Sequence, residues 1–360
     1  MKHRALALIT AALTARSGAA APDAQQMPEG WLLWHSYSEY AALDSRLYLR
    51  APDGTVQEIR GDFIHAMNGS FGSTPEQIVF MAIDKNTDEW DIYLYDSGSI
   101  SNLTQGSGVR NEDPKWSPDG RQIVFKRGRW DSEANDFIYN LALLDRTAGT
   151  VSMLTDDRAE QAMPCFSPDG NMLYYAEYSG GIGAIRCMDT LTHNAKTIYA
   201  ENGVTAYYPI SAKDCIYFTK WCSAENRHDQ IMRLDGSSLT AMPFNSERFD
   251  CSDACPAGSG LIYSSTQNGA YDLFYYDGAQ SVPLTDTRTE KNELGACFFP
   301  QLRGDVNADG RCGPADAAAL QKWLLAVPDT ELQNWKAADL NGDGRLSAAD
   351  LTLLKRSLLP

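Results

Sequence analysis

The sequence predicts an all-β body, a β-propeller of six blades with seven as the alternative, followed by a small all-α segment. A strand pattern that recurs about every 45 residues predicts the body. The composition agrees, because 28 glycines and 10% aromatic residues favour strands joined by tight turns. Two acidic loops near the C-terminus, each leading into an apolar pattern of helical period, predict the segment that follows.

The recurring unit is an apolar run that ends in aspartate. Successive runs lie about 45 residues apart, which is the length of a four-stranded blade. The 270 residues from 31 to 300 therefore hold about six such units. The five clearest runs are 91–96, 140–145, 184–189, 230–235 and 272–277.

Each run is preceded by another strand and followed by an outer one. In two repeats the preceding strand follows a Ser-Pro-Asp-Gly turn, at 117–120 and 167–170, in which proline presets φ and aspartate caps the turn. Residues 292–299 form a spare innermost strand, which we expect to pair with the N-terminal blade and close the ring. The outer strands are expected at 102–104, 153–155 and 283–285.

The Ser-Pro-Asp-Gly turn with its following strand resembles the WD40-like (PD40) repeat of the TolB propeller family. The resemblance extends over residues 31–300 and implies the fold. It implies little about function, since propellers host both enzymes and passive binding platforms.

The N-terminus is typical of an export signal. Basic residues at 1–4 precede a short apolar run at 5–15 and small residues at 18–21. We expect a signal peptide at 1–21, a short segment at 22–30 and a secreted protein; the alternative is a frayed amphipathic N-terminus. The apolar run is too short to span a bilayer, so no membrane partner is expected.

Charge and cysteines narrow the possible partners. A net charge of −16 argues against nucleic acid, anionic lipid and polyanionic substrates.

An exported protein can form disulfides, and Cys251 and Cys255 are close enough in sequence to suggest a bridge. Four other cysteines lie in strand-like runs and are expected to be free thiols: Cys165, Cys187, Cys215 and Cys297.

Two loops, at 305–316 and 339–350, fit the pattern D-x-N-x-D-G-x5-D. Calcium prefers six to eight hard oxygens, which such a loop supplies from positions 1, 3, 5, 7 and 12, with glycine at 6 for the sharp turn. We therefore expect two Ca²⁺ ions, with position 7 contributing its carbonyl and Ser347 acting through water. The ligands expected are Asp305, Asn307, Asp309, Arg311, Asp316, Asp339, Asn341, Asp343, Arg345, Ser347 and Asp350.

No entering helix precedes either loop, so these are not ordinary EF-hands. The arrangement closely resembles a type I dockerin over residues 304–360, within an expected domain at 301–360. The resemblance implies calcium-dependent binding to a cohesin domain of a scaffoldin, in an extracellular cellulosome that is on the cell surface or free. The residues that it places on the cohesin face are Pro314, Ala315, Gln321, Lys322, Ala348, Ala349, Lys355 and Arg356.

For the body, the leading hypothesis is binding of plant cell-wall polysaccharide or its fragments. The alternatives are a catalytic lyase or glycoside hydrolase module, and a TolB-like platform for protein interactions; whether the protein is an enzyme stays open. Aromatic residues before the Asp-ended strands suit stacking on sugar rings, although propeller aromatics also commonly pack between blades. The candidates are Tyr37, Trp90, Trp130, Tyr178, Trp221 and Tyr271.

Overall fold

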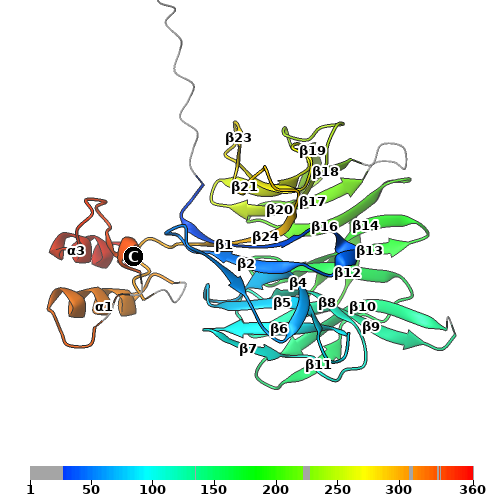
Figure 1. Ribbon diagram of the computed structural model, residues 1–360, viewed down its shortest axis with the longest axis horizontal. Coiled ribbons are helices and arrows are strands. Elements are labelled where there is room, and N and C mark those ends of the chain that lie inside the picture. The colour runs from blue at the N-terminus through cyan, green and yellow to red at the C-terminus, as the bar shows by residue number, and fades with distance from the viewer. Residues whose placement is uncertain are drawn as a thin grey trace, which may run out of the picture.

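The computed structural model describes residues 27–133, 135–221, 228–307, 311–330, 332 and 334–359 (Figure 1). The expected signal peptide and the expected ligand Asp309 lie outside the described residues. Among the residues described, no helix is long and apolar enough to cross a membrane.

The body consists of antiparallel four-stranded meanders, as the repeat predicts. The first contains the last strand of the body, in the order β24 (Asn292–Pro300), β1 (Gly30–Tyr37), β2 (Arg46–Arg50) and β3 (Val56–Ile59). The second is β4 (Phe63–Phe71), β5 (Gln77–Asp84), β6 (Trp90–Asp96) and β7 (Ser99–Asn102). The third is β8 (Asn111–Trp116), β9 (Gln122–Asp131), β10 (Asp136–Asp145) and β11 (Thr150–Met153).

The remaining strands continue the same pattern. An eight-stranded sheet consists of two meanders that meet at one parallel pair, Gly183 with Thr205. Its first half is β12 (Glu160–Phe166), β13 (Met172–Ser179), β14 (Ile182–Asp189) and β15 (Ala195–Tyr199). Its second half is β16 (Thr205–Ser211), β17 (Ile216–Trp221), β18 (Asp229–Asp235) and β19 (Ser238–Ala241). The last sheet is β20 (Cys251–Ala257), β21 (Gly260–Ser265), β22 (Asp272–Tyr276) and β23 (Ser281–Pro283).

The chain closes on itself as predicted. Strand β24 pairs antiparallel with β1, from Gly30 opposite Pro300 to Tyr37 opposite Asn292. The innermost strands contact one another in sequence around the body, from β24 through β4, β8, β12, β16 and β20 back to β24. Apolar clusters fill the spaces between neighbouring meanders; Leu47 and Phe80, both 0% exposed, belong to the one between the first and second.

The Ser-Pro-Asp-Gly turns form the contacts that their residues predict. The Ser117 hydroxyl donates to Asp119 Oδ1 at 2.6 Å, and Gly120 N donates to the Ser117 carbonyl at 2.9 Å. Gly120 has φ +69°, a left-handed conformation that glycine adopts without a steric cost. Ser167 and Asp169 repeat the first contact at 2.5 Å, so both turns fix the start of the next strand in the same way.

The expected positions of the outer strands were wrong by a few residues. Strands β7, β11 and β23 end at Asn102, Met153 and Pro283, before the Leu-Thr pairs that were expected inside them. The threonine hydroxyls instead accept a hydrogen bond from a backbone N–H of the third strand in the same meander, as Thr104 does from Ile92 at 3.0 Å. The Leu-Thr pair therefore follows the outer strand and hydrogen-bonds to the strand beside it.

The suggested bridge between Cys251 and Cys255 is also wrong, since both thiols are free. Both residues lie on β20, where four residues of extended chain span roughly 13 Å, well beyond the reach of a disulfide. They also pack into different apolar clusters. The expectation of free thiols is confirmed for Cys165, Cys187, Cys215 and Cys297.

Each innermost strand contains a bulge at the same level. One residue there takes a left-handed conformation, with φ between 51° and 64°, and the pairing register shifts beside it. The bulge directs these residues towards the axis of the body, which explains why several polar side chains gather there. The six residues are Asn68, Asp113, Met163, Tyr208, Asp253 and Gly295.

The tail forms a small helical unit beside the end of the body where β1 begins (Figure 1). It contains α1 (Pro314–Leu324), the short α2 (Trp335–Ala338) and α3 (Ala348–Ser357). Leu320, Ala338 and Leu354 are 0% exposed and form its core together with Val306. Gln301 links the two parts, since its N–H donates to the Glu29 carbonyl at 2.9 Å and its side chain donates to Asn334 at 2.7 Å.

Replacing Gly295 by alanine is expected to destabilise the body by about 2 kcal/mol more than replacing Gly203, because overpacking costs about this much. Both glycines have positive φ, +64° and +74°, so the backbone strain largely cancels between the variants. A Cβ at Gly295 would lie 2.6 Å from the His35 ring, whereas nothing lies within 4 Å at Gly203. Urea unfolding followed by tryptophan fluorescence measures the difference; equal losses would contradict the close contact.

Candidate functional site

The two acidic loops of the tail wrap around their last aspartate. Asp316 is 1% exposed, and its carboxylate accepts N–H groups from Val306 at 2.8 Å and Gly313 at 2.7 Å. Asp350, 0% exposed, accepts N–H groups from Asn341 at 3.1 Å and Ser347 at 2.9 Å. Each aspartate therefore joins the start of its loop to the start of the following helix.

The second loop turns its other acidic residues inward as well. The Asp339 carboxylate accepts N–H groups from Gly342 at 2.8 Å and Gly344 at 2.7 Å. Asp343 accepts from the Asn341 side chain at 3.0 Å. Burial opposes ionisation of Asp350, but its backbone hydrogen bonds lower the pKa of this carboxyl, so it is anionic at neutral pH.

These donors fit calcium in chemical type, because carboxylate, amide and carbonyl oxygens are the hard ligands that it prefers. Within the described ranges, however, no three His, Cys, Asp or Glu side chains are already gathered around a common metal position. The loop oxygens contact amide N–H groups instead. Bound calcium would supply a charge that draws these oxygens together.

All eight residues expected on the cohesin face are exposed. The two helices that carry most of them lie against each other, and Lys355 Nζ on α3 donates to Gln321 Oε1 on α1 at 2.8 Å. The tail also exposes large apolar side chains, which in a soluble protein mark interaction surfaces. They are Trp323, Leu325, Val327, Trp335, Leu353 and Leu359.

In the body, three of the candidate aromatics occupy equivalent places. Tyr178 pairs with Glu160, the first residue of the innermost strand β12. Trp221 and Tyr37 pair in the same way with the first residues of β16 and β24. All three therefore lie at the mouth of the central channel, on the face opposite the end of β24 from which the tail continues.

The other three candidates do not occupy these equivalent places. Trp90 is 7% exposed and packs in an apolar cluster, so it serves the core. Trp130 is 54% exposed near the tip of the β9–β10 hairpin, where its ring meets that of Phe137 at 5.3 Å. Tyr271 is half-buried, and its hydroxyl donates to Asp229 at 3.5 Å.

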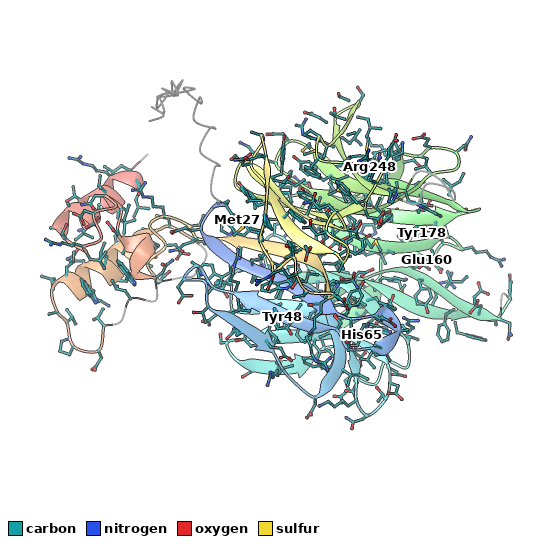
Figure 2. All side chains as sticks on the ribbon, turned by 45° about the horizontal axis from the view of Figure 1, so that its top comes forward. Met27, Tyr48, His65, Glu160, Tyr178 and Arg248 are labelled. Carbon is teal, nitrogen blue, oxygen red and sulfur yellow. The ribbon has the colours of Figure 1, made fainter. Side chains whose placement is uncertain are left out.

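A pocket of about 390 Å³ opens at this mouth. Its lining comes from the first four meanders and combines two tyrosines with carboxyl groups and a lysine. Figure 2 labels Glu160 and Tyr178 on their neighbouring strands. The lining residues used below are Tyr40, Glu112, Asp113, Lys126, Glu160 and Tyr178.

Lys126 organises the charges of this pocket. Its ammonium lies 3.1 Å from Glu112 and 2.7 Å from Glu160, so it connects the third and fourth meanders. Burial acts to lower the pKa of Lys126, but Glu112, Asp113 and Glu160 raise it overall, and the amine stays protonated. Burial raises the pKa of Asp113, whose Oδ1 accepts from Asn68 at 2.7 Å.

Glu112, Lys126 and Glu160 were not predicted as site residues. The available signal was charge at positions of the inner strands, which in a packed ring are expected to be apolar or small. Glu112 and Lys126 are paired across β8 and β9. Glu160 follows 48 residues after Glu112, and only the assembled ring brings the two into one pocket.

A second acidic group lies on the same face, between the fifth and sixth meanders. The Asp229 N–H donates to Asp250 at 2.8 Å, and Tyr207 and Tyr271 hydrogen-bond the Asp229 carboxyl. Burial, with the nearby charges of Asp250 and Asp253, raises the pKa of Asp229 to about 6.

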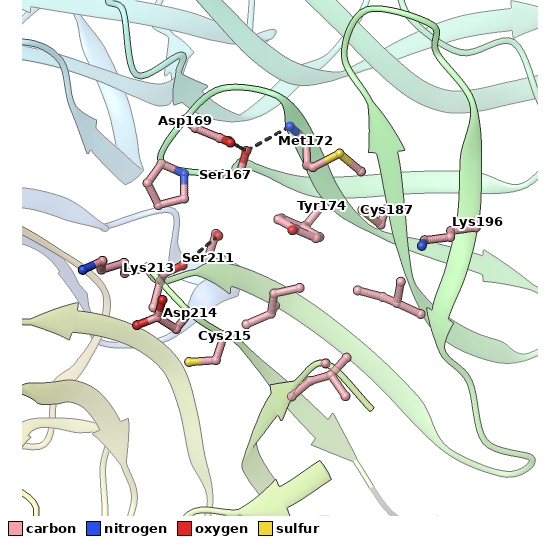
Figure 3. Close-up of a pocket in the computed structure, with 16 residues that line it drawn as sticks. Ser167, Asp169, Met172, Tyr174, Cys187, Lys196, Ser211, Lys213, Asp214 and Cys215 are labelled. Atoms are coloured by element: carbon pink, nitrogen blue, oxygen red, sulfur yellow. Dashed lines mark hydrogen bonds between the residues drawn. The ribbon is translucent and has the colours of Figure 1, made fainter. Parts of the chain in front are cut away.

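A larger pocket of about 610 Å³ lies on the opposite face, between the fourth and fifth meanders (Figure 3). Several of its polar groups are used by the turn, since Ser167 donates to Asp169 and accepts from Met172 N at 2.9 Å. Its walls are largely apolar, with Met172, Ile216 and Leu234. This space is a gap between two meanders of one sheet, and the smaller pocket at the channel mouth is the better candidate site.

The tail and the body resemble different known proteins. Residues 303–359 match the Dockerin type I domain. No curated protein matches the chain significantly. In fold, the body is similar to TolB from Acinetobacter baumannii, at 16% identity over 76% of this chain and 67% of that chain, with a TM-score of 0.59.

Two further solved structures share the fold. A Kuenenia stuttgartiensis hydrazine synthase chain is 13% identical over 75% of this chain and 46% of its own, with a TM-score of 0.64. A puromycin hydrolase is 15% identical over 73% of this chain and 47% of its own, with a TM-score of 0.52. This chain thus spans less than half of either, and at these identities the similarity shows the fold alone.

The C-terminal segment is therefore a type I dockerin domain that follows a β-propeller-like region. A dockerin supports a cohesin-binding role of the cellulosome type and implies an extracellular context. The body has the fold seen in TolB and in puromycin hydrolase.

Asp229 should make the stability of the body pH-dependent. Its pKa of about 6 in the folded chain exceeds the usual value of about 4. Its stabilising contribution is therefore complete below about pH 4 and is lost as the pH rises through about 6. We compare the unfolding free energy of the wild type with that of Asp229→Asn. The difference, wild type minus variant, should fall by about 1–2 kcal/mol over this pH range. The change is smaller than for a fully buried carboxyl because solvent screens part of the interaction.

Urea unfolding at fixed calcium concentration between pH 4 and pH 7 measures this difference. Asp136→Asn removes a charge from an exposed position on the same face and serves as the control. A difference for Asp229→Asn that does not change with pH would contradict the burial of its carboxyl.

Proposed function

We propose that this protein is a secreted cellulosome component whose dockerin binds a scaffoldin cohesin in the presence of calcium, while its propeller binds plant cell-wall glycan. The observation that carries the docking part is the match of residues 303–359 to the dockerin domain. The exposure of all eight expected contact residues supports it.

The domain limits belong to the same proposal. Residues 1–21 are removed as a signal peptide, 22–30 lead into the body, and the propeller extends over 31–300 with the dockerin at 301–360. Each four-stranded meander is one blade, which gives six blades. The cyclic contact of the innermost strands and the pairing of β24 with β1 support this count.

Two calcium ions complete the dockerin, one in each loop. The first is held by Asp305, Asn307, Asp309, Asp316 and the Arg311 carbonyl, and the second by Asp339, Asn341, Asp343, Asp350 and the Arg345 carbonyl. A segment of this size is near the lower limit for an independent core, so bound metal contributes directly to its folding. At about a thousandfold excess over Kd, one ion contributes about 4 kcal/mol.

Removing both first ligands, with Asp305→Ala and Asp339→Ala, should abolish calcium-dependent folding of the tail and weaken cohesin binding at least a hundredfold. The reason is that the remaining oxygens no longer complete either shell. Isothermal calorimetry of the full chain should record two Ca²⁺ per wild-type molecule and none for the variant. Circular dichroism should show that a chelator reduces wild-type helicity to that of the variant.

Asp329→Asn is the matched control, since it removes an acid from the same domain outside both loops. It should retain two ions and wild-type cohesin affinity. Unchanged helicity in chelator, or cohesin binding by the double variant, would contradict the calcium part of the proposal.

For the propeller, the mouth pocket supports glycan binding. It offers tyrosine rings for stacking, together with carboxylate acceptors and an ammonium donor for sugar hydroxyls. The position of the pocket also suits glycan binding by a protein that is docked through its tail. Tyr37 and Asn292 lie at the mouth end of the β1–β24 pair, and Gly30 and Pro300 lie at the end from which the tail continues.

The full chain, with calcium, should be slowed in native gels that contain at least one neutral wall polysaccharide, and it should release no products. The physical reason is reversible binding at the mouth pocket without bond cleavage. Retardation, reducing-end assays and absorbance of unsaturated sugars are measured together. If the gels show no retardation and no products form, glycan recognition would be contradicted. That result would favour a TolB-like interaction platform.

Catalytic cleavage is the second candidate, favoured by the acid group around Asp229. A carboxyl with a pKa of about 6 beside other carboxylates suits a general acid in glycoside hydrolysis. New reducing ends that disappear in Asp229→Asn would establish this function in place of binding alone. Unsaturated products would indicate a lyase.

A further inference from the structure

The pocket at the channel mouth is blind. Its rim is exposed, with Tyr40 at 53% and the Glu160 side chain at 44%. Beneath it, the space between Asp113, Lys115 and Tyr208 has a volume of about 10 Å³, room for about one water molecule. A ligand therefore enters from one face only and does not pass through the ring.

The charges select against ionic ligands of either sign. An anionic sugar such as a uronate meets the carboxylates of Glu112, Asp113 and Glu160. A cationic ligand finds the carboxylates already paired, since Glu112 lies 2.5 Å from Arg110. Lys126 occupies the space between Glu112 and Glu160 and pairs with both. A neutral polyhydroxylated ligand needs no counter-ion and can hydrogen-bond these paired groups.

The same groups suit sugar hydroxyls in detail. The Lys126 ammonium lies 3.1 Å from Glu112 and 2.7 Å from Glu160, so acceptor, donor and acceptor follow one another at hydrogen-bond spacing. Neighbouring hydroxyls of a pyranose both donate and accept, which matches this alternation. Charged partners also make stronger hydrogen bonds than neutral ones.

Tyr40 and Tyr178 supply apolar surface for the face of a sugar ring. The Tyr40 ring meets the buried His65 ring edge-on at 5.1 Å, which limits its orientation. Tyr178 is fixed opposite Glu160 in the β12–β13 pair. The aromatic and the hydrogen-bonding groups therefore line the same pocket.

We propose that this pocket binds the end of a neutral oligosaccharide chain, inserted end-on. This inference rests on the proposed glycan-binding function and deepens it by naming the ligand class and the mode of binding. A volume of about 390 Å³ is in the range of small-molecule sites, so only the terminal rings enter.

The test uses the full chain with calcium and linear neutral oligosaccharides of increasing length from the cello-, xylo-, manno- and malto-series. Calorimetry should show an affinity that stops rising after about two or three sugar units, because further rings lie in solvent. Uronate and glucosamine oligosaccharides of equal length should bind at least tenfold more weakly. Tyr40→Ala and Glu160→Gln should each weaken binding of the preferred sugar about tenfold.

Two further variants keep the result unambiguous. Val151→Ala truncates an exposed side chain on the outer strand β11 and should bind as the wild type does. Circular dichroism should show that Tyr40→Ala, at an exposed site, folds normally. Trp130→Ala probes the rival stacking surface outside the pocket.

Each contrary result would overturn a different part of the proposal. If Trp130→Ala abolishes binding of neutral sugars and Tyr40→Ala leaves it intact, the pocket is not the binding site. The proposed glycan-binding function would still stand. Affinity that keeps rising with chain length would overturn end-on insertion. Tighter binding of uronates or glucosamine chains would overturn the charge argument, and no binding of any oligosaccharide would overturn the glycan function as well.

Discussion

The pairing of β24 with β1 is the constraint on which the rest of the structure depends. It joins residues about 260 positions apart in the chain and gives the first meander the innermost strand that its own segment lacks. It also fixes where each end of these strands lies. Asn292 meets Tyr37 at the channel mouth, and Pro300 meets Gly30 where the chain continues into the dockerin.

Closure also determines the chemistry along the axis. Six inner strands converge there, and each contains a bulge with one residue in a left-handed conformation. Asn68, Asp113, Tyr208 and Asp253 are among these residues, so polar groups are buried where apolar packing is geometrically difficult. Burial raises the pKa values of Asp113 and Asp253, and the cost of holding them there is offset by hydrogen bonds such as that from Gly295 N to Asp253 at 3.0 Å.

The sequence predicts those features that depend on neighbouring residues. The Ser-Pro-Asp-Gly turns, the Asp-ended strands and the acidic loops each lie within a dozen residues, and the structure contains the turns and strands as expected. The Leu-Thr pairs were misplaced because their role is non-local. The Thr104 hydroxyl accepts a hydrogen bond from Ile92 on the neighbouring strand, a contact that the position after the Asp-ended run does not indicate.

The mouth pocket lies beyond local patterns for the same reason. Glu112 and Lys126 come from one meander and Glu160 from the next, and their distances depend on register, bulges and closure together. Among the six aromatic candidates, Tyr178 lies on the second strand of its meander and lines the pocket, whereas Trp90 begins the third strand of its own and packs in the core. Composition and spacing gave the two the same interpretation, because both precede an Asp-ended strand.

The position of the dockerin relative to this pocket has a functional consequence. The eight residues of β1 span roughly 26 Å between the tail and the mouth. A cohesin bound at α1 and α3 would therefore lie at the far end of the body from the pocket. Lys355 and Gln321 are hydrogen-bonded to each other, so the two expected docking faces adjoin. A partner that contacts one of the two helices therefore lies next to the other helix. In the function proposed above, docking on the dockerin side would leave the channel mouth directed away from the scaffold and open to a polysaccharide chain end.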